Sequence, residues 1–529
     1  MSEERNVPVS EPPEGIPPAP EGIGGRALSG VAWSYIAVSI VALGQIVFTV
    51  IMSRLVSPEA FGLIAMSGLA RGIGTLLSGM GVGAALIQKP SLSEEDKRAG
   101  FTLSVLSGIF FFGLFWALAP ALGRLFTEVR AVSVIRGASL AFVALGLNTT
   151  EESLMRREMR FRELSQIHIV GFLIGYFVIG IGSALAGAGV WALVLPPIAH
   201  TLISALLTYL RIRNPLRPTR DLSSYRALLS FGSRLSVIQL GEFFGSQIDT
   251  IVVARNAGTA LLGMYNRAFY LAVLPLQMIM YAMNQILFAS FSRIQSELQR
   301  LKVAYMTSTE VANALFLPAS AALAAAGGEL IVVLLGERYR EVAVLVPFFA
   351  AYAALNRMSL LCGLLCEAVG ELNKRLALQA VYVAGLVSAM IAVAGGPLWV
   401  YAAVLAGGEA GRLLAFNVLI IRKIIPVSLS ELVKMYVPGL IAAALVLVAV
   451  IATRVLVHDL MGLSPIIALV AEGAAAAATF IVLVRRGPLS FMRNEILSRI
   501  PVDLAGSGRN RLLTFVIRFL LGSLPEVRA

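Results

Sequence analysis

The chain has 529 residues, of which 57% are hydrophobic and only 14% are charged. This composition excludes most classes of soluble protein, because a soluble domain carries about one charged residue in four. The net charge of +12 raises the question of a nucleic-acid partner. However, the basic residues are distributed over the connections between apolar runs, so no nucleic-acid partner is predicted. Cys362 and Cys366 lie four residues apart inside an apolar run, and we interpret them as small buried side chains rather than as a disulfide or a metal site.

The predicted elements follow the chain in a simple order. Residues 1–27 are acidic and rich in proline, which is typical of a disordered tail. Apolar runs of about 20 residues follow, and this length spans a bilayer as a helix. The predicted fold is therefore an all-α polytopic membrane protein with about fourteen transmembrane helices. The predicted spans are 28–52, 61–88, 99–123, 131–150, 166–187, 190–210, 228–254, 263–290, 304–326, 342–369, 376–395, 398–421, 435–457 and 463–484.

Three other segments complete this organisation. Residues 211–227 are predicted to form a basic cytoplasmic linker. Residues 485–529 mix arginine with apolar residues, which is typical of an amphipathic basic tail. The stretch 327–341 is ambiguous between a short helix and part of an outer loop.

The basic residues predict the orientation of the chain. They gather in alternate connections, and the connections between these are short and nearly bare. This is the positive-inside bias, and it predicts that both termini lie in the cytoplasm. The residues concerned are Arg156, Arg157, Arg160 and Arg162 in one connection, Arg211, Arg213, Arg217, Arg220 and Arg226 in the next, and Arg293, Arg300 and Lys302 in a third.

One short element occurs twice. The stretch "SRLVSPEAFGLIAM" (53–66) aligns without a gap with "ARNAGTALLGMYNR" (254–267), at an offset of 201 residues that pairs Gly62 with Gly263. In the first copy, Ser57 is a plausible helix N-cap and Pro58 suits the first helical position. Six predicted spans separate the copies, so the two halves have the same orientation, as in transporters built from parallel repeats. The competing interpretation is a chance likeness of two loops.

The repeat predicts two lobes of six helices each, with a central cleft between them. The N-lobe is residues 28–210 and the C-lobe is residues 228–421. The last two spans, within 435–484, form an appended helix pair. In transporters with such repeats, the substrate binds at the interface between the halves.

Polar residues inside the spans are the candidates to line this cleft. A charge near the bilayer centre costs about 2.5–3.5 kcal/mol, so these residues must face a wet cavity or pair with one another. In span seven, Gln239, Glu242, Ser246 and Asp249 fall on one helical face. We expect nine residues to bind substrate, namely Arg71, Arg234, Arg267, Tyr270, Gln277, Tyr281, Asn284, Arg357 and Arg412. We expect three acids to couple an ion, namely Glu242, Asp249 and Glu409.

Internal ion pairing is the alternative interpretation of these charges, for example between Glu409 and Arg412 or between Asp249 and Arg267. The offset of 201 argues for a function instead, because it pairs Arg71 with Ala272 and Asp249 with Phe48. The repeated scaffold therefore does not require the polar residues.

The arginines outnumber the acids, which indicates an anionic ligand. The guanidinium group suits phosphate because its donors form a fork, and the tyrosines can stack on or hydrogen-bond to sugars. The chain has no phosphate-binding lysine motif, and its three histidines are scattered. We therefore expect no cofactor and no metal, and we expect a proton or sodium gradient as the energy source.

Several stretches resemble a known family. They are "IMSRLVSPEAFGLIAM" (51–66), "GMGVGAALIQKPSLSEED" (79–96), "VVARNAGTALLGMYNRAFYLAVLPLQMI" (252–279) and "FASFSRIQ" (288–295). Over roughly residues 28–485 the chain is similar to the Wzx/WzxC-like polysaccharide flippases of the multidrug/oligosaccharidyl-lipid/polysaccharide exporter superfamily.

This resemblance implies a transporter rather than an enzyme. Its substrate would be an undecaprenyl-diphosphate-linked oligosaccharide repeat unit, moved from the cytoplasmic to the periplasmic leaflet of the bacterial inner membrane. The product would serve exopolysaccharide or O-antigen (lipopolysaccharide) assembly. A polysaccharide polymerase and a chain-length regulator are the expected partners.

Other functions stay open at this stage. An ion-coupled multidrug exporter and a flippase for lipid-linked peptidoglycan precursors belong to the same superfamily. Five arginines inside spans count against the export of cationic drugs. A membrane glycosyltransferase or ligase would need a large outer loop, which the predicted spans leave no room for. A scaffold protein would leave the intramembrane charges unexplained.

Overall fold

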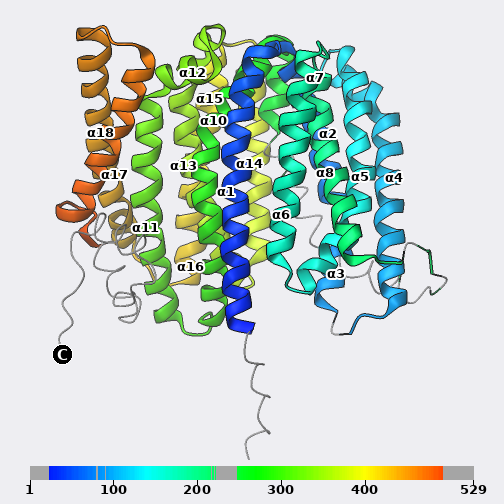
Figure 1. Cartoon of the computed structure of the whole chain (residues 1–529). Helices are drawn as coiled ribbons and strands as arrows, with labels where there is room; N and C mark the ends of the chain where they lie inside the picture. Colours follow the sequence, from blue (N-terminus) through cyan, green and yellow to red (C-terminus); the bar gives the residue numbers. More distant parts are fainter. Residues whose placement is uncertain are drawn as a thin grey trace, which may run out of the picture.

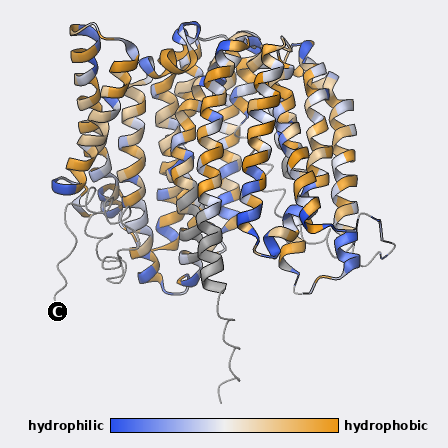
Figure 2. Ribbon diagram, in the orientation of Figure 1, coloured by the Kyte–Doolittle hydropathy of each residue, from blue (hydrophilic) through white to orange (hydrophobic). Residues whose placement is uncertain are grey.

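The computed structural model describes residues 23–78, 82–89, 91–215, 217–219, 221, 225, 243 and 247–491. Within these residues the regular structure is entirely helical. The long helices run side by side along one direction, and the connections lie at the two ends of the bundle (Figure 1). Hydrophobic residues cover the length of the helices, whereas hydrophilic residues concentrate toward the ends (Figure 2).

The first half of the chain forms a run of helices in which one segment, η1, is a π-helix. The elements are α1 (Ile23–Leu55), α2 (Pro58–Ser78), α3 (Val82–Gln88), α4 (Glu94–Leu125), α5 (Arg130–Arg157), α6 (Phe161–Phe172), η1 (Leu173–Gly180), α7 (Ile181–Leu185) and α8 (Trp191–Ile212). The start of α4 shows why a helix begins there. The Ser93 side chain accepts a hydrogen bond from the backbone of Asp96, whose carboxylate accepts one from Ser93 in return.

The second half has a similar series, followed by two more long helices. Its elements are α10 (Ile248–Arg293), α11 (Leu298–Ala325), α12 (Gly327–Leu335), η2 (Glu337–Leu345), α13 (Val346–Ala368), α14 (Leu372–Ala392), α15 (Leu398–Ala415), η3 (Phe416–Ile421) and α16 (Arg422–Ile424). The elements α17 (Leu429–Arg454), η4 (Val455–Leu460) and α18 (Pro465–Arg486) follow; α17 packs on α11, and α18 packs on α11 and α12. Here η2 is a 3-10 helix, and η3 and η4 are π-helices.

The predicted spans within the described residues fall on helices. Ten described helices are long and apolar enough to cross a membrane, or eleven if the bent pair α11 and α12 counts as one span. The protein is therefore a multi-pass membrane protein, while the number fourteen stays a prediction. The ambiguous stretch 327–341 forms α12, which bends by 69° away from α11, and the start of η2. Most of span seven and most of both tails lie outside the described residues, while residues 23–27, predicted as the end of the N-terminal tail, form the start of α1.

Both predicted turn-and-restart elements are present. In the first half, α1 ends at Leu55 and α2 restarts at Pro58. In the second half, α10 is interrupted at Gly258, whose φ of +83° is a left-handed conformation that glycine adopts without strain. Gly258 lies 201 residues after Ser57, which is the offset found in the sequence.

The two repeated elements also pack against each other. A Cβ atom added to Gly62 would lie 1.9 Å from the carbonyl oxygen of Thr259, and one added to Gly263 would lie 1.9 Å from the carbonyl oxygen of Pro58. The offset of 201 pairs Pro58 with Thr259, so one contact is made twice in opposite directions. We call this reciprocal contact of α2 with α10 the glycine crossing. A two-fold axis between the helices produces such a contact, which supports a parallel repeat over a chance likeness.

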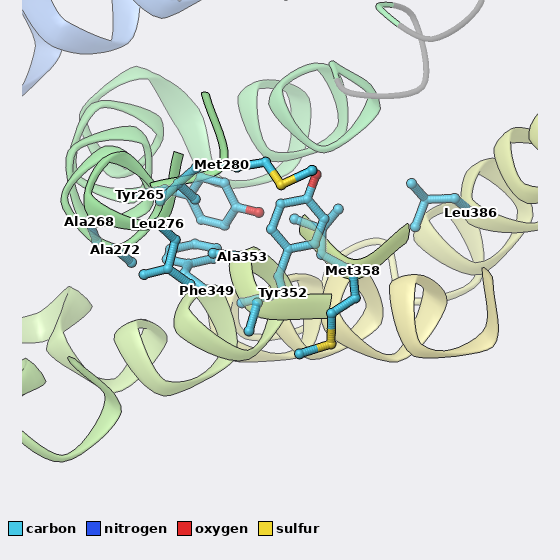
Figure 3. Close-up of a cluster of buried hydrophobic side chains, with 14 of the residues drawn as sticks. Tyr265, Ala268, Ala272, Leu276, Met280, Phe349, Tyr352, Ala353, Met358 and Leu386 are labelled. Carbon is cyan, nitrogen blue, oxygen red and sulfur yellow. The ribbon is translucent and has the colours of Figure 1, made fainter. Parts of the chain in front are cut away.

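Part of the core of the second half is a cluster of buried side chains from α10 and α13, with Leu386 of α14 beside it (Figure 3). The Tyr265 ring packs edge-on against Phe349 with 4.9 Å between ring centroids. Ala272, which the offset pairs with Arg71, is completely buried in this cluster. The alanine therefore contributes to packing, as its small apolar side chain would suggest.

Candidate functional site

Two internal cavities lie within the bundle. The first has a volume of about 610 Å³ and is surrounded by α1, α2, η1, α8 and α10. Its polar lining consists of Gln45, Thr49, Arg71, Tyr176, Gln247, Asn266, Arg267 and Tyr270. The second has a volume of about 490 Å³ and is surrounded by α10, α13, α14, α15 and η3. Its polar lining consists of Gln247, Gln277, Tyr352, Asn356, Arg357, Ser359, Arg375, Gln379, Tyr382, Glu409 and Arg412. Phe243 and Gln247 belong to both linings.

The first cavity is cationic. Arg71 and Arg267 line it, and its lining within the described residues includes no aspartate or glutamate. Arg267 donates a hydrogen bond to Asn266 Oδ1 at 3.1 Å, and its Nε has no hydrogen-bond partner within the described part of the chain. The Arg267 guanidinium also lies 4.8 Å from the Phe61 ring centroid and 5.4 Å from that of Tyr270. Aromatic faces hold a guanidinium in place without neutralising it, so its donors stay available to an anion.

Neutral polar groups surround these two arginines. Tyr270 donates a hydrogen bond from its hydroxyl to Gln45 Oε1 at 2.8 Å, which joins α10 to α1 across the cavity. Tyr176 and Asn266 contribute further hydroxyl and amide groups. Such groups can exchange hydrogen bonds with hydroxyl-rich ligands.

Gly68 on α2 leaves space for the first cavity, whereas a Cβ atom added to Gly72 would lie 2.1 Å from the Phe243 ring. A Cβ atom added to Gly68 would meet no other atom within 4 Å. The offset of 201 pairs Gly68 with Phe269 and Gly72 with Val273, and both of these larger residues line the second cavity. The two cavities therefore occupy corresponding positions along α2 and α10, with glycines on one side and bulky side chains on the other.

Two of the three arginines that line the second cavity are paired with acids. Arg412 pairs with Glu409 at 2.8 Å, donates to Gln379 Oε1 at 2.9 Å and lies 4.7 Å from the Tyr382 ring centroid. Arg375 pairs with Glu367. The pairing of Glu409 with Arg412 is the internal ion pair that the alternative interpretation predicted.

Arg357 differs from the other two arginines of the second cavity. It donates to Asn356 Oδ1 at 2.6 Å, and its Nε has no hydrogen-bond partner among the described residues. No described carboxylate forms an ion pair with it. Among the described residues, Arg357 is therefore the one arginine of this cavity without an ion-pair partner.

The structure distributes the predicted site residues over both cavities. Arg71, Arg267 and Tyr270 line the first, whereas Gln277, Arg357, Glu409 and Arg412 line the second. Arg234, Glu242 and the side chains of Tyr281 and Asn284 lie outside the described part of the chain.

Asp249 lines neither cavity. It is buried on α10 and accepts a hydrogen bond from the Tyr265 hydroxyl at 3.2 Å. The pair of Asp249 with Arg267, offered as an example of internal pairing, is absent from the described contacts, because the tyrosine satisfies the carboxylate instead.

Sequence reasoning missed several lining residues. Gln45 is the one amide side chain in the first span, whose other polar residues are serines, a threonine and a tyrosine, and this was a usable signal; Thr49 carried none. Tyr176 and Tyr382 carried no such signal, because a tyrosine in an apolar span is equally compatible with the core. Their role depends on which helices are neighbours.

Hydrogen bonds join the two halves at the end of the bundle that contains the glycine crossing. Thr259 donates from its hydroxyl to Glu128 Oε2 at 2.6 Å, and Glu128 pairs with Arg130 at 2.9 Å. These contacts, first the hydrogen bond from Arg130 and then the one from Thr259, lower the pKa of Glu128 from 4.5 to about 2. Arg54 donates to the carbonyl of Val333 at 3.0 Å. The halves are therefore held together at this end.

The apolar helical bundle and its polar interior define a multi-pass membrane protein with an internal cationic cavity. Residues 51–344 match the model of the polysaccharide biosynthesis protein family, and the chain belongs to that family.

Curated relatives agree with this assignment. The chain is 25% identical over 324 residues to the lipopolysaccharide biosynthesis protein WzxC of Escherichia coli strain K12, covering 60% of this chain and 65% of WzxC. It is 26% identical over 310 residues to the succinoglycan biosynthesis transport protein ExoT of Rhizobium meliloti strain 1021, covering 58% of this chain and 62% of ExoT. The alignments therefore span slightly less than two thirds of these relatives.

Solved structures show the same fold at low sequence identity. The lipid II flippase MurJ in an inward closed conformation matches with a TM-score of 0.65 at 11% identity, covering 88% of this chain and 100% of MurJ. An inward-facing multidrug resistance transporter of the MATE family and MOP superfamily matches with a TM-score of 0.57 at 14% identity, covering 76% of this chain and 98% of that transporter.

Proposed function

We propose that this protein is a flippase that moves undecaprenyl-diphosphate-linked oligosaccharides from the cytoplasmic to the periplasmic leaflet, for exopolysaccharide or O-antigen assembly. The observation that carries the proposal is the first cavity, where Arg71 and Arg267 face open space without a described carboxylate in the lining. Two such cations inside a membrane protein favour an anionic ligand. Membership of a polysaccharide biosynthesis family supports a sugar-bearing one.

The chemistry of the cavity suits the headgroup of such a lipid. Each guanidinium can give two parallel hydrogen bonds to phosphate oxygens, which suits a diphosphate. Tyr176, Tyr270 and Asn266 would bind the first sugars. The polyprenyl chain would stay in the bilayer, because its burial in the cavity would gain nothing over lipid.

Two other transport functions share this fold but agree less well with the cavity or with the family. A MATE-like fold is compatible with drug export, but a cationic cavity would repel cationic drugs. A lipid-linked peptidoglycan precursor also carries a diphosphate, so the cavity alone does not separate it from an oligosaccharide. The family match of residues 51–344 favours the oligosaccharide.

Transport in this account alternates the access of the cleft between two six-helix lobes, with both termini in the cytoplasm of a bacterial inner membrane. The end with the glycine crossing then faces the periplasm. Cysteines placed at Arg160 and Arg217 in a Cys-free variant should resist impermeant thiol reagents added from outside. Ready labelling at both sites would contradict this orientation.

Energy coupling is part of the same proposal. Glu242 or Asp249 would bind a proton or Na⁺ and couple its gradient to the return of the empty protein. In proteoliposomes, Glu242→Gln or Asp249→Asn should lose stimulation by an imposed gradient but keep slow downhill flipping. If both variants are stimulated by the gradient as the wild type is, Glu242 and Asp249 are structural residues and do not couple an ion.

Polymer export in cells tests the proposed function. Arg71→Ala and Arg267→Ala should each lower export by about tenfold to a hundredfold, because one lost charge-assisted hydrogen bond costs about 1.5–3 kcal/mol. Lysine at either position should restore part of the export, since it keeps the charge but loses the fork. Arg422→Ala is the matched control, because Arg422 is exposed on α16 and lines neither cavity. Normal export by both cavity variants, at normal membrane levels, would contradict the proposal.

A further inference from the structure

A third cavity lies at the end of the bundle opposite the beginning of α1, at the seam between α12 and the helices α17 and α18 (Figure 1). Its volume is about 330 Å³, and it shares no lining residue with the two cavities described above. Five of its lining residues are titratable or charged, namely Glu329, Arg340, Arg454, His458 and Asp459. The transport proposed above uses none of them.

Two buried carboxylates meet at this seam. The side chain of Glu329 is 9% exposed, and its Oε1 lies 3.6 Å from Nε of Arg454. Its Oε2 has no hydrogen-bond partner within the described residues. Glu472 on α18, which packs on α12, is 1% exposed, and neither of its oxygens has a hydrogen-bond partner within the described residues. A buried carboxylate oxygen without a donor is costly, so a ligand cation that donates a hydrogen bond to Glu329 Oε2 would stabilise this site.

The mouth of the same cavity carries exposed charges of both signs, because Asp459 is exposed there together with Arg454 and Arg340. The side chain of Arg454 is 43% exposed, whereas Arg340, 67% exposed, already pairs with Glu337 at 2.7 Å. His458 already contacts the carbonyl of Leu463 through Nδ1 at 3.3 Å. The cavity thus combines the buried carboxylate of Glu329 with the exposed guanidinium of Arg454. A ligand with a primary ammonium joined to a phosphate matches both features.

The surroundings indicate a lipid as the source of this ligand. Apolar side chains of η4 and α18 next to the cavity are strongly exposed, with Leu456 at 55%, Leu460 at 74% and Ile466 at 62%. Such residues face acyl chains in a multi-pass membrane protein. We propose that the cavity between α12, η4 and α18 binds the headgroup of a phosphatidylethanolamine-type phospholipid, with its ammonium at Glu329 and its phosphate at Arg454.

Binding there joins elements that are distant in the sequence. Glu329 belongs to α12, which continues from α11, whereas Arg454 and Glu472 belong to the last two long helices. The lipid therefore supplies the missing donors and holds α17 and α18 against α12.

Native mass spectrometry of the delipidated full chain tests this inference. Lipids with matched acyl chains are titrated, namely phosphatidylethanolamine, phosphatidylcholine and phosphatidylglycerol, together with free phosphoethanolamine. Phosphatidylcholine keeps the positive charge but has no N–H donor, so it isolates the hydrogen bonds. The wild type should bind phosphatidylethanolamine about tenfold more tightly than the other two lipids, since one charge-assisted hydrogen bond is worth about that factor.

Variants then locate the site. Glu329→Gln should abolish the preference, whereas Glu341→Gln should leave it unchanged, because Glu341 is exposed on η2 and does not line the cavity. Equal binding of the three lipids by the wild type would overturn the proposal without recourse to any variant. Free phosphoethanolamine binding as tightly as the lipid would show a site for a soluble ligand instead, which also overturns it. So would equal losses in Glu329→Gln and Glu341→Gln.

Discussion

The glycine crossing and the two cavities involve the same two helices, α2 and α10. At the crossing the paired positions of the repeat hold the same residue, whereas along the cavities they hold different residues. At the crossing, the same contact is made twice. Gly62 packs against the carbonyl of Thr259, which follows the break in α10, and Gly263 packs against the carbonyl of Pro58, which begins α2. A turn or two further along, Gly68 and Arg71 line the first cavity, whereas the paired positions hold Phe269 and a buried Ala272. The positions that agree between the halves pack the two helices closely, and the positions that differ provide the polar lining of the first cavity.

This difference has a physical reason. Two helices approach within backbone contact only where neither carries a Cβ, so the crossing requires glycine on both sides. A cavity needs space and charge on one side only, because a single anionic headgroup fills it. The residues that differ between the halves are therefore better indicators of the ligand than those that agree.

The largest effect should come from giving the first cavity the residue found at the paired position of the second half. Gly68→Phe introduces the side chain of the paired residue, Phe269, into open space, because a Cβ at Gly68 meets no atom within 4 Å. The ring should fill the cavity without moving the backbone, and flipping should fall to background while the protein level in the membrane stays normal. Gly68→Ala is the control and should keep most of the activity. If Gly68→Phe flips like the wild type, the first cavity is not the path.

The next effect should come from disturbing the crossing itself. Gly62→Ala places a Cβ 1.9 Å from the Thr259 carbonyl oxygen, so the helices must separate. We expect a loss of about 3 kcal/mol in stability, at the upper end of typical overpacking costs. Thermal unfolding in detergent measures it, and Gly263→Ala should behave alike because the contact is reciprocal.

Gly68→Ala, which is the same substitution six residues further along α2, should leave the unfolding temperature unchanged. Equal unfolding temperatures for Gly62→Ala and Gly68→Ala would show that the helices do not approach so closely.

The smallest effect concerns Glu128, which accepts a hydrogen bond from Thr259 at the glycine crossing. Glu128 has a pKa lowered from 4.5 to about 2, so its stabilising contribution is present above pH 4.5 and is lost as the pH falls from about 4.5 to about 2. Glu128→Gln should remove this part of the pH dependence of unfolding. Thr259→Val should remove less of it, because the hydrogen bond from Arg130 remains. A profile for Glu128→Gln that matches the wild type throughout this window would contradict the assignment.

The sequence was most informative about features that depend only on the order of residues along the chain. The length of the apolar runs predicted a multi-pass helical protein, and the offset between Gly62 and Gly263 predicted a repeat before any contact was known. Pro58 at the start of α2 and the break at Gly258 follow from local backbone preferences. These features depend on neighbours along the chain.

The division of the polar residues into two cavities could not be predicted in this way. Arg267 and Arg412 look equivalent in sequence, yet Arg412 pairs with Glu409 one helical turn away and Arg267 lies between two aromatic rings. The buried acids Glu329 and Glu472 are more than 140 residues apart, and only the packing of α18 on α12 brings them together. Such partners depend on helix neighbours rather than on spacing.

Flipping by the purified protein in proteoliposomes tests the central claim most directly. The substrate is a fluorescent undecaprenyl-diphosphate-linked oligosaccharide, compared with a neutral glycolipid that carries the same sugars. The account predicts that the wild type flips the diphosphate lipid only, and that the double variant Arg71→Ala, Arg267→Ala flips neither. Equal rates for wild type and double variant, or rapid flipping of the neutral glycolipid by the wild type, would contradict a cationic cavity that recognises the diphosphate.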